Sequence, residues 1–234
     1  AVLLGVGAAF GENAVGVSAF VGAFAISLGV LFIANLGGRA NAVKLLLGGM
    51  ALSAVCSAFS SFIIYFANNK DGIQTVTYWL MGSLAGANWD TLPVIGGIVV
   101  LAVLFFWTQS RILNLMLEGE TAAIPLGRPL LPFMRLYLGL NALLVGAVVL
   151  NAGLIGFLGL LVPHFTRMLL GADHRRLLPA AVLFGGIAAT WADILGRVLV
   201  RGVDIPLGVM LALMGAPAFI VMLTRRAYRF GGAE

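Results

Sequence analysis

The feature that most constrains this chain is a series of long apolar stretches almost free of charged residues. A helix of about 20 apolar residues is long enough to cross a bilayer core about 30 Å thick. After an apolar segment at 1–10, such stretches occur at 14–36, 45–66, 91–110, 136–151, 155–166, 177–196 and 205–224. Only 10% of the residues are charged, against roughly 25% in an ordinary soluble domain. We therefore expect an all-α, polytopic membrane helical bundle, which excludes a water-soluble globule.

The stretch at 155–166 is too short to span a bilayer alone, and Asn151-Ala152-Gly153 separates it from the stretch before it. A broken helix is tolerated at membrane depth only where protein buries its ends. The chain starts at Ala1, and residues 1–10 are already apolar, without the basic n-region of a secretion signal. We therefore expect that a segment upstream is missing, so that the number of helices is a minimum.

The distribution of Lys and Arg predicts the orientation, because cytoplasmic loops carry an excess of both. If the segments alternate in direction, the connections fall into two sets. One set holds only Lys70, Arg197 and Arg201. The other holds eleven basic residues: Arg39, Lys44, Arg111, Arg128, Arg135, Arg167, Arg175, Arg176, Arg225, Arg226 and Arg229. The connections at 37–44, 111–135 and 167–176 and the C-terminus are therefore predicted to be cytoplasmic.

The chain shows no energy source of its own for uphill transport. An ATP-binding P-loop needs Gly-Lys-Ser/Thr, and neither Lys44 nor Lys70 lies in that sequence. An ion-coupled carrier would be expected to keep a carboxylate near the membrane midplane. Eight of the nine carboxylates fall instead in connections: Glu12, Asp71, Asp90, Glu118, Glu120, Asp173, Asp204 and Glu234.

The ninth carboxylate, Asp193, stands four residues before Arg197, and this spacing places both on one helix face. The pair is predicted to lie close to the outer interface. It is either a structural ion pair with a snorkelling arginine or a docking point for a partner.

Small residues recur at helical spacing within 45–66, at Gly49, Ser53 and Ser57. This pattern is typical of tight helix packing, and the rival interpretation is a smooth, mildly polar face along a solute pathway. The last segment contains Pro206 and Pro217, and proline breaks the hydrogen-bond ladder of a helix. We expect a kinked or discontinuous helix there.

The connection 111–135 contains an amphipathic helix start over 117–127, with acidic residues in its first turn. It is either a docking element or a solvated linker. Catalysis has little support, since no serine has a His/Asp partner set on its own side. His164, next to Pro163, is expected to satisfy a backbone carbonyl rather than to bind a metal. With Cys56 and two histidines the chain is poor in zinc ligands, and we expect it to bind no cofactor or metal.

Several motifs, in order along the chain, resemble the FecCD-type permeases, the membrane subunits of ABC importers for iron-siderophores, haem and cobalamin. These motifs are LLLGGMALS at 45–53, YWLMGSL at 78–84 with Trp89, the loop from Gly119-Glu120 to Leu126-Gly127, IGFLGLLVPH at 155–164, Asp173-His174-Arg175, Ala192-Asp193, PLGV at 206–209 and Gly215-Ala216-Pro217. The resemblance extends over essentially the whole chain.

The resemblance implies one permease domain over 1–234, of a ten-helix type whose first two helices and most of the third are missing from this chain. It implies a multi-pass protein of the inner or plasma membrane with a cytoplasmic C-terminus. The expected partners are two cytoplasmic ATPase subunits that hold ATP and Mg, a second copy of the permease or a similar chain, and an extracytoplasmic substrate-binding protein. No partner nucleic acid is expected.

The resemblance also assigns roles to residues. Arg197 matches an arginine that faces the binding protein, which favours the docking interpretation. Asn41, Ala42 and Val43 match an inner gate, and Gly49, Ser53 and Ser57 match the helix that lines the pathway. Residues 78–84 match an outer connection near the mouth. The ATPase-coupling positions are Gly119, Glu120, Ala122, Ala123, Leu126 and Gly127.

The function predicted on this basis is ATP-driven uptake of an iron chelate by alternating access, with ATP hydrolysis in a separate subunit, so that the chain itself is not an enzyme. Ser53 favours a siderophore over haem, and cobalamin remains an alternative. From other classes, the alternatives are an ion-gradient-driven secondary transporter or channel and an intramembrane enzyme.

Overall fold

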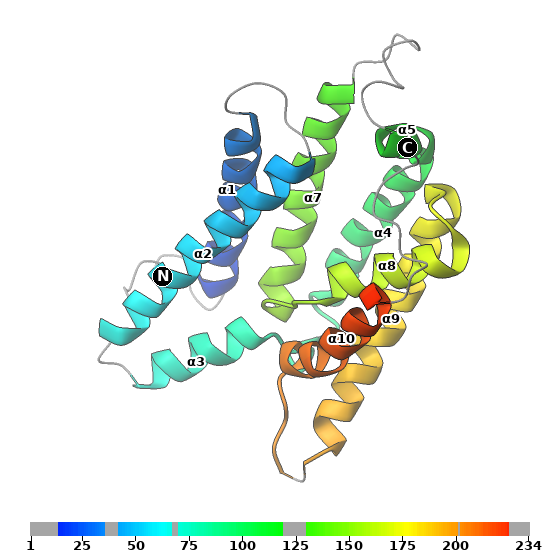
Figure 1. Cartoon of the computed structure of the whole chain (residues 1–234). Helices are drawn as coiled ribbons and strands as arrows, with labels where there is room; N and C mark the ends of the chain where they lie inside the picture. Colours follow the sequence, from blue (N-terminus) through cyan, green and yellow to red (C-terminus); the bar gives the residue numbers. More distant parts are fainter. Residues whose placement is uncertain (1–13, 36–41, 67–69, 119–129, 201, 225–234) are drawn as a thin grey trace. The chain divides into compact units, whose positions relative to one another are not determined.

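The structure is a computed structural model that describes residues 14–35, 42–66, 70–118, 130–200 and 202–224 (Figure 1). The described residues form helices joined by turns and short irregular connections, with no strand among them. The helices are α1 (Ala14–Asn35), α2 (Ala42–Phe66), α3 (Lys70–Met81), α4 (Leu92–Thr108), α5 (Ser110–Glu118), α7 (Leu130–Ala152), α8 (Leu158–Leu170), α9 (His174–Val198) and α10 (Leu207–Thr224). The prediction of an all-α bundle is confirmed.

Each apolar stretch predicted from residue 14 onward corresponds to a helix, while the segment at 1–10 lies outside the described residues. The prediction for 136–151 was too short, because α7 begins at Leu130 and includes Arg135. A charged side chain near a helix end can reach the interface, so the charge did not mark the boundary. The break after 136–151 is real: the chain leaves helix at Ala152 and re-enters it at Leu158.

Two segments differ from their prediction. Residues 70–81 form the helix α3, although no pattern in the sequence predicted one there and 78–84 was interpreted as a connection. The last segment is helical only from Leu207, and the Pro206 carbonyl accepts hydrogen bonds from the N–H groups of Val209 and Met210. Pro206 therefore precedes the helix, where its missing N–H breaks no ladder, and Pro217 lies inside α10.

Three described helices are long and apolar enough to cross a membrane: Lys44–Phe66, Pro132–Ala152 and His174–Val198. The bent pair α4 and α5, whose axes differ by 61°, would provide a fourth if it forms one span. Shorter apolar helices cover Phe20–Ile33, Leu158–Leu170 and Leu207–Val221. These helices support a multi-pass membrane protein. Which side the C-terminus faces stays a prediction.

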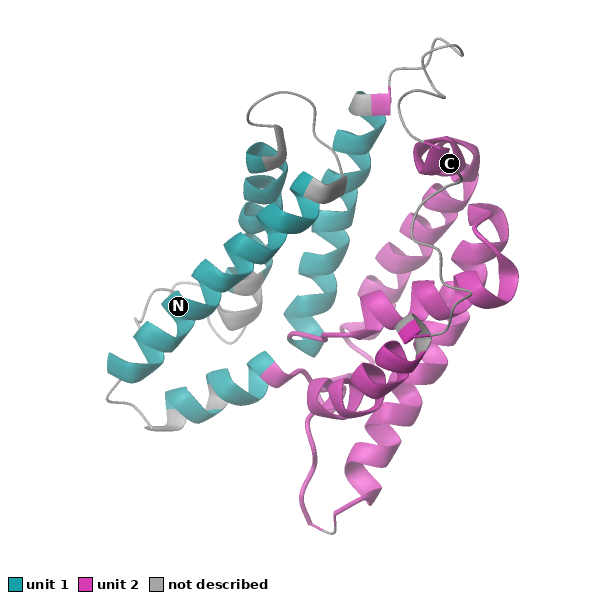
Figure 2. Ribbon diagram, viewed as in Figure 1, with its two compact units in different colours: residues 1–80, 131–153 teal, residues 81–130, 154–234 magenta. Residues whose placement is uncertain are grey.

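The chain falls into two compact units, shown in Figure 2. The first unit consists of residues 1–80 and 131–153 and holds α1, α2, α3 and nearly all of α7. Within it, α1 packs on α2, where Leu52 Cδ2 lies 3.2 Å from the place that a Cβ on Gly29 would take. The ring of Phe20 in α1 occupies the space beside Gly146 of α7, 2.6 Å from that glycine's ideal Cβ position. Glycine thus allows both close approaches.

The second unit consists of residues 81–130 and 154–234, and α9 is its central helix, in contact with α4, α5, α8 and α10. Its core is a cluster of buried side chains from α9 and α10, with partly buried residues from α8, α9 and the connections packed against them. The core residues are Ala192, Leu207, Met210 and Leu211, and those packed on them are Leu84, Ile155, Leu158, Leu195 and Ile205.

The connection between α9 and α10 is fixed at its end by main-chain hydrogen bonds. The Ile205 N–H donates to the Gly196 carbonyl at 3.1 Å, and the Leu207 N–H donates to the Gly82 carbonyl at 3.1 Å. Gly82 has a φ of 70°, and a Cβ there would collide with the Leu154 carbonyl oxygen. Its missing side chain therefore permits both the left-handed turn and the close approach of three chain segments.

Candidate docking, coupling and pathway sites

Arg197 lies in the last turn of α9 and forms the predicted ion pair with Asp193. Its Nε–H donates to Asp193 Oδ2 at 2.8 Å, and the two side chains are 45% and 22% exposed. The two Nη groups make no hydrogen bond to any described residue. An exposed pair of this kind contributes little to stability. It does orient the guanidinium while leaving its outer donors available to an incoming carboxylate.

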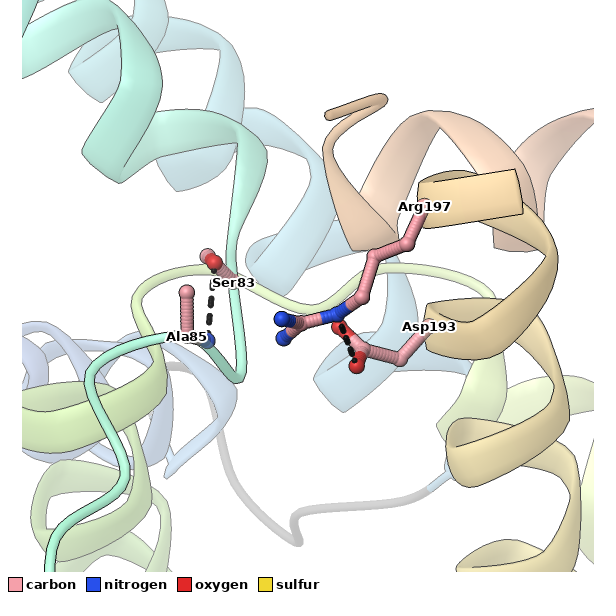
Figure 3. A network of polar contacts seen from close by, with 4 residues as sticks. All are labelled: Ser83, Ala85, Asp193 and Arg197. Atoms are coloured by element: carbon pink, nitrogen blue, oxygen red, sulfur yellow. Dashed lines mark hydrogen bonds and ion pairs between the residues drawn. The ribbon is translucent and has the colours of Figure 1, made fainter. Parts of the chain in front are cut away.

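The guanidinium of Arg197 points toward the turn that follows α3 (Figure 3). In this turn the Ala85 N–H donates to Ser83 Oγ at 3.1 Å, a local bond that shapes the backbone. Asp204, in the connection to α10, also attracts the Arg197 charge. The Arg197 guanidinium is thus paired with Asp193 on its own helix, is attracted by Asp204 in the following connection, and points toward the turn after α3.

The proposed pathway face of α2 is open within its own unit. Gly49 is half-buried with no atom within 4 Å of its ideal Cβ position, and Ser53 and Ser57 are exposed. The contact with α1 uses other positions, because Gly48 lies against Ile33. The small-residue face is therefore not the surface that packs on α1. Of the inner-gate residues, Ala42 and Val43 form the first turn of α2, and Asn41 lies outside the described residues.

The six expected coupling residues, Gly119, Glu120, Ala122, Ala123, Leu126 and Gly127, lie outside the described residues. The helix that leads into them, α5, is described as far as Glu118. Helix already begins at Ser110, so the segment that was predicted to start a helix at 117 is in part the end of one.

Sequence reasoning missed a polar cluster that joins the α4–α5 segment to the start of α9. Asn114 of α5 donates through Nδ2 to Asp173 Oδ1 at 2.7 Å, and its Oδ1 accepts from the His174 backbone N–H at 2.8 Å. The Nδ1 of His174 also lies 2.7 Å from Asn114 Oδ1. In α4, Trp107 Nε1–H donates to the Arg175 carbonyl at 3.0 Å. We name these five residues the α5–α9 clamp.

Asp173 has two roles in the clamp. It is the N-cap of α9, where its carboxylate accepts the Arg175 N–H at 3.1 Å, and it accepts the Asn114 amide. The hydrogen bond from Asn114, followed by that from the Arg175 backbone, lowers the pKa of the Asp173 carboxyl below its ordinary value. The negative charge also lies at a helix N-terminus, where the helix dipole favours it.

The other histidine behaves as predicted: His164 Nδ1 lies 2.6 Å from the Leu160 carbonyl oxygen, which it can reach only as an N–H donor. Across the described ranges, the structure shows no group of three or more His, Cys, Asp or Glu side chains that could hold a metal ion. His174 and Asp173 are adjacent, but both side chains are hydrogen-bonded to Asn114.

Comparison with known proteins places the chain in a family. Residues 1–225 match the FecCD transport family. The chain is 38% identical over 216 residues to the hemin transport system permease protein HmuU of Yersinia pestis, covering 92% of this chain and 64% of that protein. It is also 38% identical over 229 residues to the vitamin B12 import system permease protein BtuC of Salmonella typhimurium, covering 97% of this chain and 68% of that protein.

A solved structure, described as an ABC transporter of metal-chelate type in an inward-facing conformation, superposes with a TM-score of 0.75 at 33% identity. The superposition covers 88% of this chain and 72% of that one. The chain therefore belongs to the FecCD transport family, and the resemblance inferred from its motifs is confirmed. It spans about two thirds of the length of the curated relatives, between 64% and 68%.

Proposed function

We propose that this chain is part of the membrane-spanning permease subunit of an ATP-driven importer that takes up an iron chelate of the siderophore class. The match of residues 1–225 to one transport family carries the proposal. Relatives named for hemin and vitamin B12 transport keep those two cargoes as alternatives. The chain would act as a single permease domain, multi-pass in the inner or plasma membrane, with its C-terminus in the cytoplasm.

In this proposal the chain performs no covalent chemistry. Two separate ATPase subunits bind ATP and Mg and press on residues 119–127, and a second permease chain completes the pathway along Gly49, Ser53 and Ser57 of α2. Closure of the ATPases favours one of two helix packings, and release favours the other, which gives alternating access. Two of the expected gate residues, Ala42 and Val43, form the first turn of α2, the helix that carries the expected pathway face.

The test is uptake by the full-length protein, co-purified with its ATPase subunits and reconstituted in vesicles with the companion binding protein. A ferric hydroxamate, haemin and cyanocobalamin are the three probes. We expect ATP-dependent accumulation of the hydroxamate. Accumulation of haemin or cyanocobalamin would correct the cargo alone. Accumulation driven by a proton or sodium gradient without nucleotide would overturn the proposal.

We further propose that Arg197 docks the extracytoplasmic binding protein through an acidic side chain of that partner. The pre-oriented guanidinium, whose Nη groups make no hydrogen bond to a described residue, supports this role. Arg197→Glu should weaken binding of the purified partner by about tenfold or more, because it places like charges across the contact. Arg176→Glu makes the same charge change at the other end of α9 and should leave the affinity unchanged. Equal affinities for the two variants would contradict the assignment.

A further inference from the structure

The α5–α9 clamp connects two parts of the chain that are 59 to 68 residues apart in sequence. Its central member is Asn114, whose single amide group serves three hydrogen bonds. Asn114 lies in the second turn of α5, the nine-residue helix that runs directly into 119–127. The clamp therefore holds the last described helix before the expected ATPase contact.

The hydrogen-bond chemistry of the clamp allows one arrangement. The Asn114 Nδ2 group must face Asp173, because a carboxylate is only an acceptor. The Oδ1 atom then faces the His174 N–H and Nδ1, so that Nδ1 carries a hydrogen. Turning the amide over would set an oxygen against the carboxylate and an NH₂ group against an N–H. Asn114 thus fits its place by the direction of its dipole as well as by its size.

The clamp also completes the start of α9. The first N–H groups of a helix lack partners inside that helix. Here the Asn114 side chain accepts the N–H of His174, and the Asp173 side chain accepts that of Arg175. Trp107, near the end of α4, holds the same turn through the Arg175 carbonyl. A displacement of α5 therefore breaks bonds on the first turn of α9 unless that turn moves with it.

The helix that the clamp holds is the central helix of its unit. It runs 25 residues from His174 to Val198, about 37 Å at 1.5 Å per residue, and Arg197 lies in its last turn. Near that end, Gly196 and Ala192 pack against the start of α10 and the connection before it. A shift of α9 at the clamp therefore reaches the residues around Arg197 through one continuous helix.

We propose that Asn114 is a positioning residue, which makes α5 and α9 move as one body and so links the ATPase-coupling segment to the end of α9 that carries Arg197. This inference rests on the proposed function, since it assigns a role to the segment after Glu118 in an ATP-driven importer. It goes beyond that function by naming the contact that couples the movement of α5 to that of α9.

The test exchanges the amide and the carboxylate of the clamp in the full importer. Asn114→Asp sets two carboxylates against each other. The double variant Asn114→Asp with Asp173→Asn restores a donor opposite an acceptor between the two side chains. Asp173 Oδ1 accepts both the Asn114 amide and the Arg175 N–H, so an amide nitrogen in its place loses the bond from the Arg175 N–H. Asn88→Asp is the matched control: it makes the same change in the connection before α4, where Asn88 Oδ1 only accepts hydrogen bonds from Thr91.

The readouts are the number of probe molecules taken up per ATP hydrolysed, the KM for ATP, and the amount of ATPase subunit that co-purifies. The probe is whichever of the three chelates the wild type accumulates. We expect Asn114→Asp to lower uptake per ATP by about tenfold, within the usual range of coupling energies. The KM and the co-purified ATPase should stay at the wild-type level, and the control should match the wild type. The double variant should recover part of the uptake, because it restores the contact between the two side chains but not the bond from the Arg175 N–H.

Uptake per ATP by Asn114→Asp equal to that of the wild type would overturn the inference, and so would a double variant that recovers nothing. If Asn114→Asp alone does not assemble, the double variant decides, because recovery supports the pairing and failure contradicts it. A wild type that accumulates no probe with ATP contradicts the proposed function instead, so the two failures are distinguishable.

Discussion

Replacing Gly196 by alanine tests whether the junction between α9 and α10 is as tight as the structure shows. The change adds one methyl group inside a helix, and on helix propensity alone it should stabilise by about 1 kcal/mol. The ideal Cβ position, however, lies 2.7 Å from the Ile205 carbonyl oxygen and 3.3 Å from Met210 Cγ. The first neighbour is backbone and cannot rotate away, so the chain must shift.

The magnitude follows from the balance between these opposing effects. Overpacking of a tight contact costs about 1–3 kcal/mol, and the bond from the Ile205 N–H to the Gly196 carbonyl, worth about 0.5–1.5 kcal/mol, weakens with the shift. Together, these two costs exceed the gain in helix propensity. We expect Gly196→Ala to lower the free energy of unfolding by about 1–3 kcal/mol relative to the wild type.

Gly186→Ala provides the control, because Gly186 lies in the same helix and has no atom within 4 Å of its ideal Cβ position. It should be neutral or stabilising by up to about 1 kcal/mol. The assay is thermal unfolding of the purified protein in detergent, followed by size-exclusion chromatography. A gap of about 2 kcal/mol between the variants corresponds to about 4–8 °C in Tm for a chain of this size. Equal melting temperatures would refute the tight junction.

Two further predictions concern α7 and the clamp. Gly146→Ala should destabilise the folded protein by about 1–3 kcal/mol, because the new Cβ would lie 2.6 Å from the Phe20 ring. Gly139→Ala, in the same helix, places its Cβ in open space and should not destabilise the protein. Equal Tm values for the two variants would contradict the α1–α7 contact. The pKa of Asp173 is lower in the folded protein than its ordinary value of 3.8, so the charged carboxylate stabilises the fold at pH values above 3.8. That stabilisation is lost as the pH falls through the lower folded-state pKa. The Tm advantage of the wild type over Asp173→Asn should therefore shrink in acid, and a constant difference from about pH 7 to about pH 3 would refute the assignment.

Much of the fold was predictable from the sequence, because charge-free stretches of membrane length are a direct consequence of the bilayer's cost for polar groups. The boundaries of the helices were less predictable. α7 includes Arg135, and α3 begins with Lys70 and Asp71, so a search for charge-free windows shortens the first and misses the second. At 12 residues, α3 is also shorter than the about 20 residues of a membrane span, so a search for spans does not find it.

The site residues divide in the same way. The i,i+4 spacing of Asp193 and Arg197 predicted their ion pair, because helix geometry alone brings them together. Asn114 carried no such signal: it is a single asparagine in a segment that was predicted to be a connection, and its partners Asp173 and His174 lie about 60 residues later. Only the tertiary structure brings these residues together. The motif containing Asp173 and His174 supported the resemblance but did not reveal what the two side chains hold.

The anchors at Gly82 and Gly196 hold the connection before α10 by main-chain atoms. An alanine scan of residues 203–207 would report the core packing of Ile205 and Leu207, but it leaves those N–H and C=O groups in place and so would not report the main-chain anchors. The junction's dependence on its glycines would escape such a survey. Chemical replacement of the Leu207 amide by an ester, which deletes one donor and changes no side chain, is the kind of modification that would expose it.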